Sequence, residues 1–193
     1  MTDIKSYYQQ RLNHYTKLAE EYNRKSRSLS MIRLFCFVLW GLAIYISTFY
    51  NMTMVMWSIL VGLVVFVFLV IWHNKVLDKK KAYDVYRDIN SKELKALNND
   101  YSSFEDGSEF IDEAHKYTHD LDVFGPFSLF QFLNRCFSLL GKDDLAERLR
   151  SGYQEKSRIL AQQAAVEELS QKNEWMQEFR VLGAQTTARQ KTK

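Results

Sequence analysis

The longest apolar segment of the chain covers residues 34–72, which are 39 residues without a single Asp, Glu, Lys, Arg or His. Apolar runs of 18 or more residues predict membrane helices, because the ~30 Å hydrocarbon core of a bilayer takes about 20 residues at 1.5 Å each. As one straight helix, the segment would be roughly 58 Å long, which is too long for a single crossing. The polar pair Tyr50-Asn51 lies near its middle and indicates a turn. We therefore expect a transmembrane hairpin of two helices within residues 31–72.

Two other interpretations of this segment fit the sequence less well. The first is a helical hairpin buried inside a soluble protein. The rest of a chain of only 193 residues would then have to cover both helices on every side. A cleaved signal peptide is excluded, because the segment is too long and the polar residues 1–30 precede it.

Amphipathic segments lie on either side of the hairpin, over residues 3–30 and 76–97, with apolar residues mostly three or four positions apart. The first contains no Gly or Pro, so we expect it to run directly into the first membrane helix. Because a hairpin brings both segments out on one side of the membrane, their tyrosine-rich stripes should pair. The sequence therefore predicts an antiparallel cytoplasmic helical stalk made of residues 1–30 and 73–98.

Basic residues flank the apolar segment, whereas the turn between its helices carries no charge. Positively charged flanks stay in the cytoplasm, so both termini are expected there in a multi-pass protein. The lipid bilayer is the first expected partner, and the basic clusters should meet anionic headgroups rather than nucleic acid. These clusters are Arg24, Lys25, Arg27 and Arg33 upstream, and Lys75, Lys79, Lys80 and Lys81 downstream.

Beyond the stalk, the pattern predicts an acidic loop over residues 99–127, a small helical domain over 128–183 and a disordered tail over 184–193. Ser128 is the expected N-cap of a buried helix over residues 129–140, and Gly141 should end that helix in the C′ position. Further helices are expected over 143–149 and 155–179, with a break at Ser151-Gly152 and an end at Gly183.

Charge is divided unevenly along the chain, whose formal net charge is +3. Residues 1–81 carry 11 Lys+Arg against 4 Asp+Glu, whereas residues 82–193 carry 15 against 19. The basicity therefore belongs to the membrane flanks, and the acidic remainder argues against a DNA-binding surface. Cys36 and Cys136 lie in apolar surroundings and suggest no disulfide, zinc site or reactive thiol.

No catalytic constellation is evident in the sequence. A metal-dependent enzyme built on the acidic loop is an alternative, but both the calcium-loop pattern and the HExxH glutamate are missing. Its candidate ligands are Asp112, Glu113, His115, His119, Asp120 and Asp122. We expect Asp120, Asp122 and Arg135 instead to form hydrogen bonds or an ion pair that fixes the loop to the helical domain.

A run of motifs in the C-terminal half suggests a family. It comprises Asp120-Leu121-Asp122-Val123-Phe124-Gly125, Ser128-Leu129-Phe130 and Leu133-Asn134-Arg135, then Gly141, Leu145-Ala146, Leu149, Ile159, Gln163, Ala165-Val166 and Glu168-Leu169. This run resembles the start of the helical core of the MutS family of mismatch-repair ATPases, and particularly a bacterial branch in which a two-span membrane hairpin precedes that core. The chain departs from the family pattern at Lys116, Cys136, Ser138 and Gln162.

The resemblance implies an all-α protein of the bacterial inner membrane that ends in a small MutS-core-like domain. Such ATPases bind ATP and Mg²⁺ through a GxxxxGK[ST] loop, but the Gly-Lys pair at Gly141-Lys142 has no such context. We therefore expect no cofactor and no enzymatic activity in this chain, which would be a fragment or a shortened paralogue. ATP and Mg²⁺ would belong to an absent ATPase domain, and we expect no direct DNA binding.

Two functions follow from this sequence. The first is a non-catalytic membrane anchor that tethers a helical core and partners a MutS-type ATPase segment or a second copy. The second is a membrane scaffold that recruits a cytoplasmic protein and has no nucleic-acid role. The residues expected to matter are structural, namely Asp120, Asp122, Phe124, Gly125, Leu129, Asn134, Arg135 and Gly141.

Overall fold

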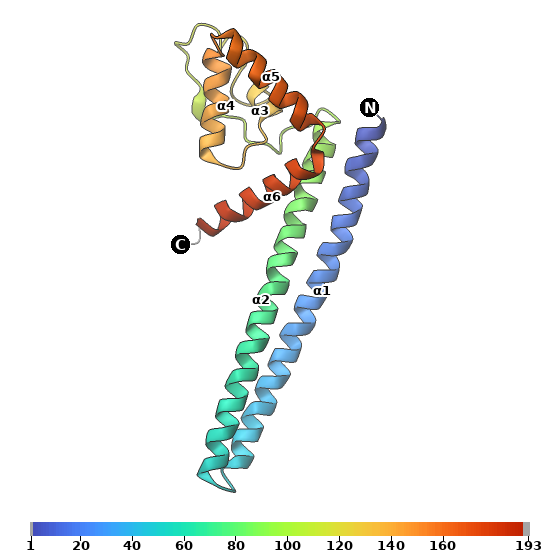
Figure 1. The fold of residues 1–193 in the computed structure, drawn as a ribbon, viewed down its shortest axis with the longest axis vertical. Helices are drawn as coiled ribbons and strands as arrows, with labels where there is room; N and C mark the ends of the chain where they lie inside the picture. Colours follow the sequence, from blue (N-terminus) through green and yellow to red (C-terminus); the bar gives the residue numbers. More distant parts are fainter. Residues whose placement is uncertain (1, 191–193) are drawn as a thin grey trace. The chain divides into compact units, whose positions relative to one another are not determined.

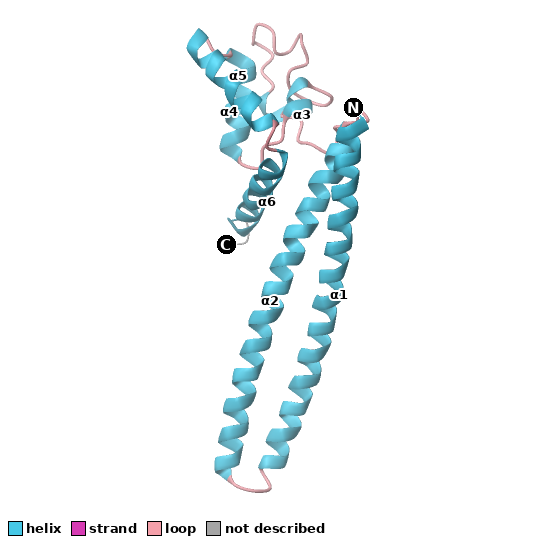
Figure 2. Ribbon diagram, turned by 45° about the vertical axis from the view of Figure 1, so that its right-hand side comes forward, coloured by secondary structure: helices cyan, strands magenta, loops and turns pink. Residues whose placement is uncertain are grey.

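The computed structural model describes residues 2–190, which are all-helical apart from loops and turns. The described part of the chain forms six α-helices and a short 3-10 helix, and it contains no strand. The α-helices are labelled in Figures 1 and 2. The chain divides into two compact units. The hairpin unit is Asn13–Asp84, and the core unit combines the N-terminal residues up to Leu12 with the chain from Val85 onward.

Two long helices, α1 (Thr2–Ser47) and α2 (Met52–Ala96), run antiparallel and side by side through the hairpin unit (Figures 1 and 2). The turn between them is closed by backbone hydrogen bonds such as Tyr50 N to Ser47 O at 3.1 Å and Met54 N to Asn51 O at 2.9 Å. The predicted turn at Tyr50-Asn51 is confirmed, and α1 passes without a break from its polar segment into its apolar one.

One glycine sets how closely the two helices approach each other. A Cβ at Gly62 of α2 would overlap the indole of Trp40 of α1, whereas a Cβ at Gly41 would meet nothing within 4 Å. The Trp40 indole N–H donates a hydrogen bond of 3.0 Å to the Ser58 carbonyl of α2. Close approach at a small residue is how helices pack in lipid, where no hydrophobic force draws them together.

Both helices are long and apolar enough to cross a membrane. The most apolar 18-residue window of α1 is 6% buried and that of α2 is 0% buried, so these side chains point outward. A soluble protein rarely exposes a continuous apolar surface of this size. A hairpin buried inside a globular core, the alternative weighed above, is therefore not what the structure shows.

Nearer its open end, the hairpin unit has a small interior of its own. Ala19, Leu29 and Val76 are buried between the helices. The Tyr83 ring of α2 lies against two rings of α1, with centroids 6.2 Å from Tyr15 and 5.1 Å from Tyr22. Tyrosine contacts thus join the two helices outside the charge-free segment.

The core unit is built around a cluster of aromatic rings. Phe124 and Phe130 are buried, and Phe110 lies against both, with ring centroids 5.9 and 5.5 Å away. Ala146 completes the cluster from α4 (Leu139–Ser151). The Arg150 guanidinium covers the outer side of these rings and donates to the Phe110 carbonyl at 2.8 Å.

The acidic loop is ordered by its own side chains and includes the 3-10 helix η1 (Ser108–Phe110). The Asp100 carboxylate accepts hydrogen bonds from the backbone N–H and the hydroxyl of Ser102, at 3.2 and 2.6 Å. Asp106 does the same with Ser108, at 3.0 and 2.9 Å. These Asx turns explain why a segment rich in aspartate has a defined path without strands or long helices.

The prediction of one helix over residues 129–140 is wrong. α3 (Leu129–Leu133) ends at Asn134, and α4 begins at Leu139. Polar side chains compete with the helix in between, because the Asn134 amide oxygen accepts from Cys136 N at 3.0 Å and the Ser138 hydroxyl accepts from Gly141 N at 3.1 Å. Gly141 therefore lies in the first turns of α4 and does not end a helix. The predicted N-cap at Ser128 is confirmed.

The predicted long helix over residues 155–179 is two helices. α5 (Lys156–Ser170) stops where the Ser170 hydroxyl donates to the Glu167 carbonyl at 2.7 Å, and α6 (Asn173–Gln190) follows. The break at Ser151-Gly152 is confirmed, with Gly152 at φ 61°.

α6 also continues past Gly183, where the sequence predicted an end and a disordered tail over 184–193. A Cβ at Gly183 would overlap the Phe137 ring, so this glycine serves packing rather than termination. The last part of the predicted tail, residues 191–193, lies outside the described residues.

Candidate functional site: a polar junction in the core unit

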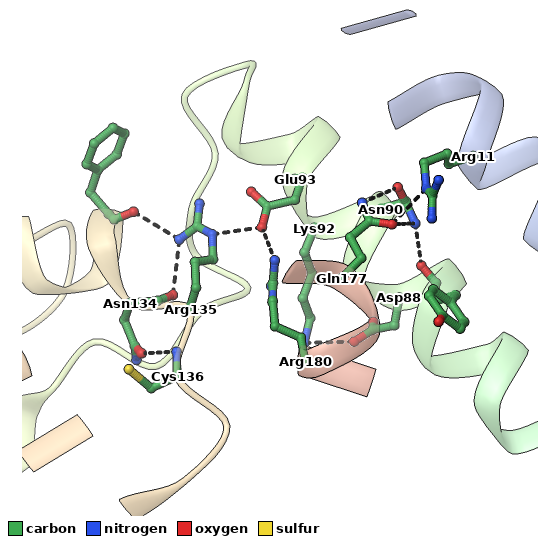
Figure 3. A network of polar contacts seen from close by, with 12 residues as sticks. Arg11, Asp88, Asn90, Lys92, Glu93, Asn134, Arg135, Cys136, Gln177 and Arg180 are labelled. Atoms are coloured by element: carbon green, nitrogen blue, oxygen red, sulfur yellow. Dashed lines mark hydrogen bonds and ion pairs between the residues drawn. The ribbon is translucent and has the colours of Figure 1, made fainter. Parts of the chain in front are cut away.

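Six polar side chains meet in the core unit, and together they are called the polar junction here (Figure 3). They come from four separate segments of the chain: the start of α1, the end of α2, the segment after α3, and α6. The members are Arg11, Asn90, Glu93, Arg135, Gln177 and Arg180.

Glu93 is the anionic centre of the polar junction. Its Oε1 accepts from Arg135 Nε at 2.9 Å and from Arg180 Nη1 at 2.7 Å. The side chains of Glu93 and Arg180 are only 12% and 18% exposed, so water screens the two contacts weakly. One carboxylate thereby ties α2, the segment after α3 and α6 together through charge-assisted hydrogen bonds.

A buried amide pair lies beside this ion-pair network. Asn90 is 0% exposed, and its Oδ1 accepts from Gln177 Nε2 at 3.1 Å. Asn90 Nδ2 also donates to the Tyr86 carbonyl at 2.7 Å, within α2. Gln177 Oε1 accepts from Arg11 Nε at 2.8 Å, which brings the start of α1 into the network. Buried amides are tolerated when their donors and acceptors are paired in this way.

Arg135 is a structural residue, as the sequence predicted, but its partners differ from the predicted ones. Beyond Glu93, its Nη1 donates to the carbonyls of Phe132 and Asn134, at 2.9 and 3.0 Å. Its guanidinium lies 3.7 Å from the centroid of the Phe104 ring. The expected partners Asp120 and Asp122 form no ion pair in the described structure. The acid that fixes Arg135 is Glu93 of α2.

The polar junction also contributes to a shift in the pKa of Tyr8, a neighbouring residue of α1. Burial of the phenol, followed by the nearby Glu93 carboxylate, raises the pKa of Tyr8 above its ordinary value. Tyr8 therefore stays neutral at physiological pH and acts as a half-buried packing group of α1. Elsewhere, burial raises the pKa of the Cys136 thiol, which keeps that cysteine protonated and weakly nucleophilic.

The other sequence-predicted residues have separate local roles. Phe124 belongs to the aromatic cluster, and Gly125 has φ 103°, a conformation that glycine adopts without strain. Asn134 is 3% exposed and donates to the Glu105 carbonyl at 3.1 Å. Leu129 is 47% exposed, and so is not the core residue that the dense apolar pattern implied. Asp120 and Asp122 are both exposed.

Sequence reasoning missed five of the six junction residues, namely Arg11, Asn90, Glu93, Gln177 and Arg180. A signal for two of them was present, because Asn90 and Glu93 fall between the buried apolar positions Ile89 and Leu94 of α2. A polar residue on an apolar helical stripe indicates a buried partner. Their partners Gln177 and Arg180 each lie 87 residues further along the chain, and only the fold identifies them.

Candidate chemistry is limited in the described residues. Nowhere in residues 2–190 do three or more His, Cys, Asp or Glu side chains gather closely enough to hold a metal ion. His115, one of the candidate ligands, packs edge-on against the Tyr117 ring at 4.8 Å. The polar junction itself has ion pairs and amides but no nucleophile beside a base, so its arrangement suits holding helices together.

Comparisons with known proteins add no relative. No protein-family model matches the chain, and no curated protein and no solved structure matches it either. The interpretation of function therefore rests on the hairpin unit, the polar junction and the motif run.

Proposed function

We propose that this chain is a non-catalytic membrane anchor, with α1 and α2 spanning a bacterial inner membrane and both termini in the cytoplasm. The observation that carries this proposal is the outward-facing apolar surface of the hairpin unit, bounded by basic residues on both helices. An uncovered surface of this kind is stable only against lipid or another apolar partner. Basic residues at one end and an uncharged turn at the other favour cytoplasmic termini.

The polar junction suggests what the anchor does for the core unit. Arg11 belongs to α1, and Asn90 and Glu93 belong to α2, so both helices of the hairpin also supply groups to the junction. Through Arg135, Gln177 and Arg180, the same groups hold the segment after α3 and α6. The junction therefore holds the first part of α1 and the last part of α2 together with the rest of the core unit.

The proposed relation to MutS-type ATPases rests on the motif run. Within that run, Phe124 and Asn134 are buried and Arg135 is bonded at the junction, which agrees with helix-packing roles. The motor itself would come from a partner or from further sequence, and this chain would relay its movement to the membrane. The DNA next to the reading frame tests this relation, because it should encode GxxxxGK[ST] and a MutS-type ATPase. A neighbourhood without such an ATPase would contradict it.

A second candidate is a membrane scaffold that recruits a cytoplasmic protein. Large apolar side chains of the core unit remain exposed, and residues 82–193 carry 15 Lys+Arg against 19 Asp+Glu, which disfavours nucleic acid. The exposed residues include Phe127, Leu139, Leu140, Trp175 and Leu182. Purified chain that binds neither DNA nor a MutS-type ATPase, but retains one defined protein through these residues, would favour this candidate.

Membrane insertion can be tested with charged substitutions and alkaline extraction. Val64→Asp combined with Phe68→Asp places two acids in the apolar part of α2, at about 3 kcal/mol each near the centre of a bilayer. We expect the wild-type chain to stay in the membrane pellet and this variant to be lost from it. The matched control, Leu160→Asp with Val166→Asp on exposed positions of α5, should stay in the pellet. Release of the wild-type chain by alkaline carbonate would contradict the proposal.

A further inference from the structure

A groove lies between α1 and α2 of the hairpin unit, close to the boundary between charged and charge-free sequence. It has a volume of about 650 Å³ and lies entirely within residues 21–79. Its polar wall includes Arg24, Lys25, Lys75 and Lys79, together with Glu21. Leu29 and Val76, which are buried between the helices, belong to its apolar floor. The groove thus joins a basic rim to an apolar floor.

The positive charge of the groove is only partly neutralised by the protein. Lys25 pairs with Glu21 at 2.6 Å, and this hydrogen bond raises the pKa of Lys25 above its ordinary value. Lys79 lies 5.9 Å from the centroid of the Tyr22 ring. Arg24 and Lys75 have no acid within 4.0 Å in the described structure. Two cations therefore face the groove without a protein counter-ion.

The position of the groove distinguishes among possible anions. Ile32 and Trp72 line its other end, and Trp72 is the last residue of the charge-free segment. Tryptophan at the end of an apolar helix is typical of the membrane–water interface. A free phosphate ion would use the cations alone, whereas a phospholipid would use the cations for its headgroup and the apolar end for its acyl chains.

We propose that this groove binds the headgroup of an anionic phospholipid from the cytoplasmic leaflet. Arg24 and Lys75 hold the phosphate, because an arginine offers a planar pair of donors and a lysine a compact charge. Ile32 and Trp72 contact the upper part of the acyl chains. This inference rests on the proposed membrane anchoring and adds a specific lipid site to it. Basic pockets between membrane helices on the cytoplasmic side are known to suit such headgroups.

The chain provides a matched pair of variants for the test. Arg24→Gln with Lys75→Gln removes two charges that line the groove. Lys80→Gln with Lys81→Gln removes two charges from the same basic flank that do not line it. Both variants lose the same net charge, so general attraction to an anionic surface falls equally in each. Circular dichroism of each purified protein checks that the helices are retained.

Binding is measured on the full chain in neutral-lipid nanodiscs, titrated with phosphatidylglycerol. We expect saturable binding that the groove variant weakens about 10- to 30-fold, as the loss of two basic contacts implies, and that the flank variant weakens less than about 3-fold. The single variant Arg24→Lys keeps a positive charge at this position and leaves Lys75 unchanged. It should therefore retain much of the wild-type binding. Equal weakening by both double variants would show general charge attraction and overturn the proposal.

Two further measurements distinguish a bound phospholipid from other occupants of the groove, namely a soluble anion and a second copy of the chain. Inorganic phosphate and glycerol 3-phosphate should fail to compete at concentrations where phosphatidylglycerol saturates the groove, and full competition by either would identify a soluble-anion site instead. Doubling of the particle mass in neutral lipid, abolished by Arg24→Gln with Lys75→Gln, would mean that a second copy fills the groove. If the chain inserts into membranes and the groove variant still binds as wild type, only this inference fails. Failure to insert would overturn the proposed function itself.

Discussion

The core unit has a buried aromatic centre, whereas the apolar segment of the hairpin unit faces outward. In the hairpin unit, large side chains such as Phe35 and Leu42 are 64% and 52% exposed, and the helices approach each other at Gly62, beside the Trp40 hydrogen bond. In the core unit, Phe130 is 0% exposed and polar groups lie buried in paired networks. The proposed membrane anchoring predicts this difference, because lipid accepts the apolar side chains that water drives inward.

The largest expected difference comes from the same substitution made in each unit. Phe130→Ala empties the centre of the aromatic cluster and should destabilise the core unit by about 3–5 kcal/mol. Phe35→Ala, in an outward-facing position of α1, should cost less than about 1 kcal/mol in a micelle or bilayer, since lipid replaces the lost contacts. Denaturant unfolding of each variant measures both values. Equal costs would mean that the two units share one kind of surroundings.

Glu93→Gln should give the next largest effect, at about 2–3 kcal/mol of lost stability in the core unit. The change leaves Arg135 and Arg180 without their shared counter-charge in a weakly screened place. Glu174→Gln is the control, because Glu174 pairs with Arg11 but its side chain is 78% exposed, and such pairs contribute at most about 1 kcal/mol. Chemical unfolding followed by circular dichroism compares them. A cost for Glu174→Gln as large as that for Glu93→Gln would refute a buried junction.

Gly62→Leu tests how the hairpin unit is held together, with an expected cost of about 1–3 kcal/mol from overpacking against Trp40. Gly41→Leu introduces the same side chain where a Cβ meets nothing within 4 Å, and should be nearly neutral. Detergent-titration unfolding of the hairpin, read by tryptophan fluorescence, measures both. The interpretation fails if Gly41→Leu proves as disruptive as Gly62→Leu.

The smallest effect is a titration in the acidic loop. The Ser102 hydroxyl, and then its backbone N–H, hold the pKa of Asp100 below its ordinary value. A lowered folded-state pKa contributes stability above the unfolded-state pKa, and this contribution is lost as the pH falls through the folded-state value. Ser102→Ala should therefore raise the Asp100 pKa. As the pH falls, the stability contributed by Asp100 should then be lost at a higher pH than in the wild type. Carboxyl chemical shifts in an NMR titration measure the Asp100 pKa. An unchanged pKa in Ser102→Ala would contradict the claim that the hydrogen bonds with Ser102 lower it.

The sequence was most informative where one physical force dominates. The charge-free segment and its polar pair Tyr50-Asn51 predicted two helices and their turn, since burial in lipid leaves few alternatives. Helix ends in the core unit were harder, because Asn134 and Ser138 interrupt an apolar run through local hydrogen bonds that periodicity does not register. Likewise, Gly141 and Gly183 fit the pattern of helix ends but lie inside helices.

The polar junction was almost invisible to sequence reasoning. Arg135 was identified as structural, yet its partner Glu93 lies 42 residues away and was not considered. The motif run had directed attention to Asp120 and Asp122, which are exposed. Pairing of polar groups between distant segments depends on how helices dock, and one sequence alone contains no direct record of it.

The central claim is that the hairpin unit spans a membrane with its turn on the outer side and both termini in the cytoplasm. The most direct measurement places single cysteines in a Cys36→Ser, Cys136→Ser background, at Asn51→Cys in the turn and at Ser102→Cys in the acidic loop. A membrane-impermeant maleimide is then applied to cells with a permeable outer layer and an intact inner membrane. The account predicts labelling of the turn cysteine at once, and labelling of the loop cysteine only after the inner membrane is opened. Labelling of the loop cysteine in intact cells, or equal access to both, would contradict it.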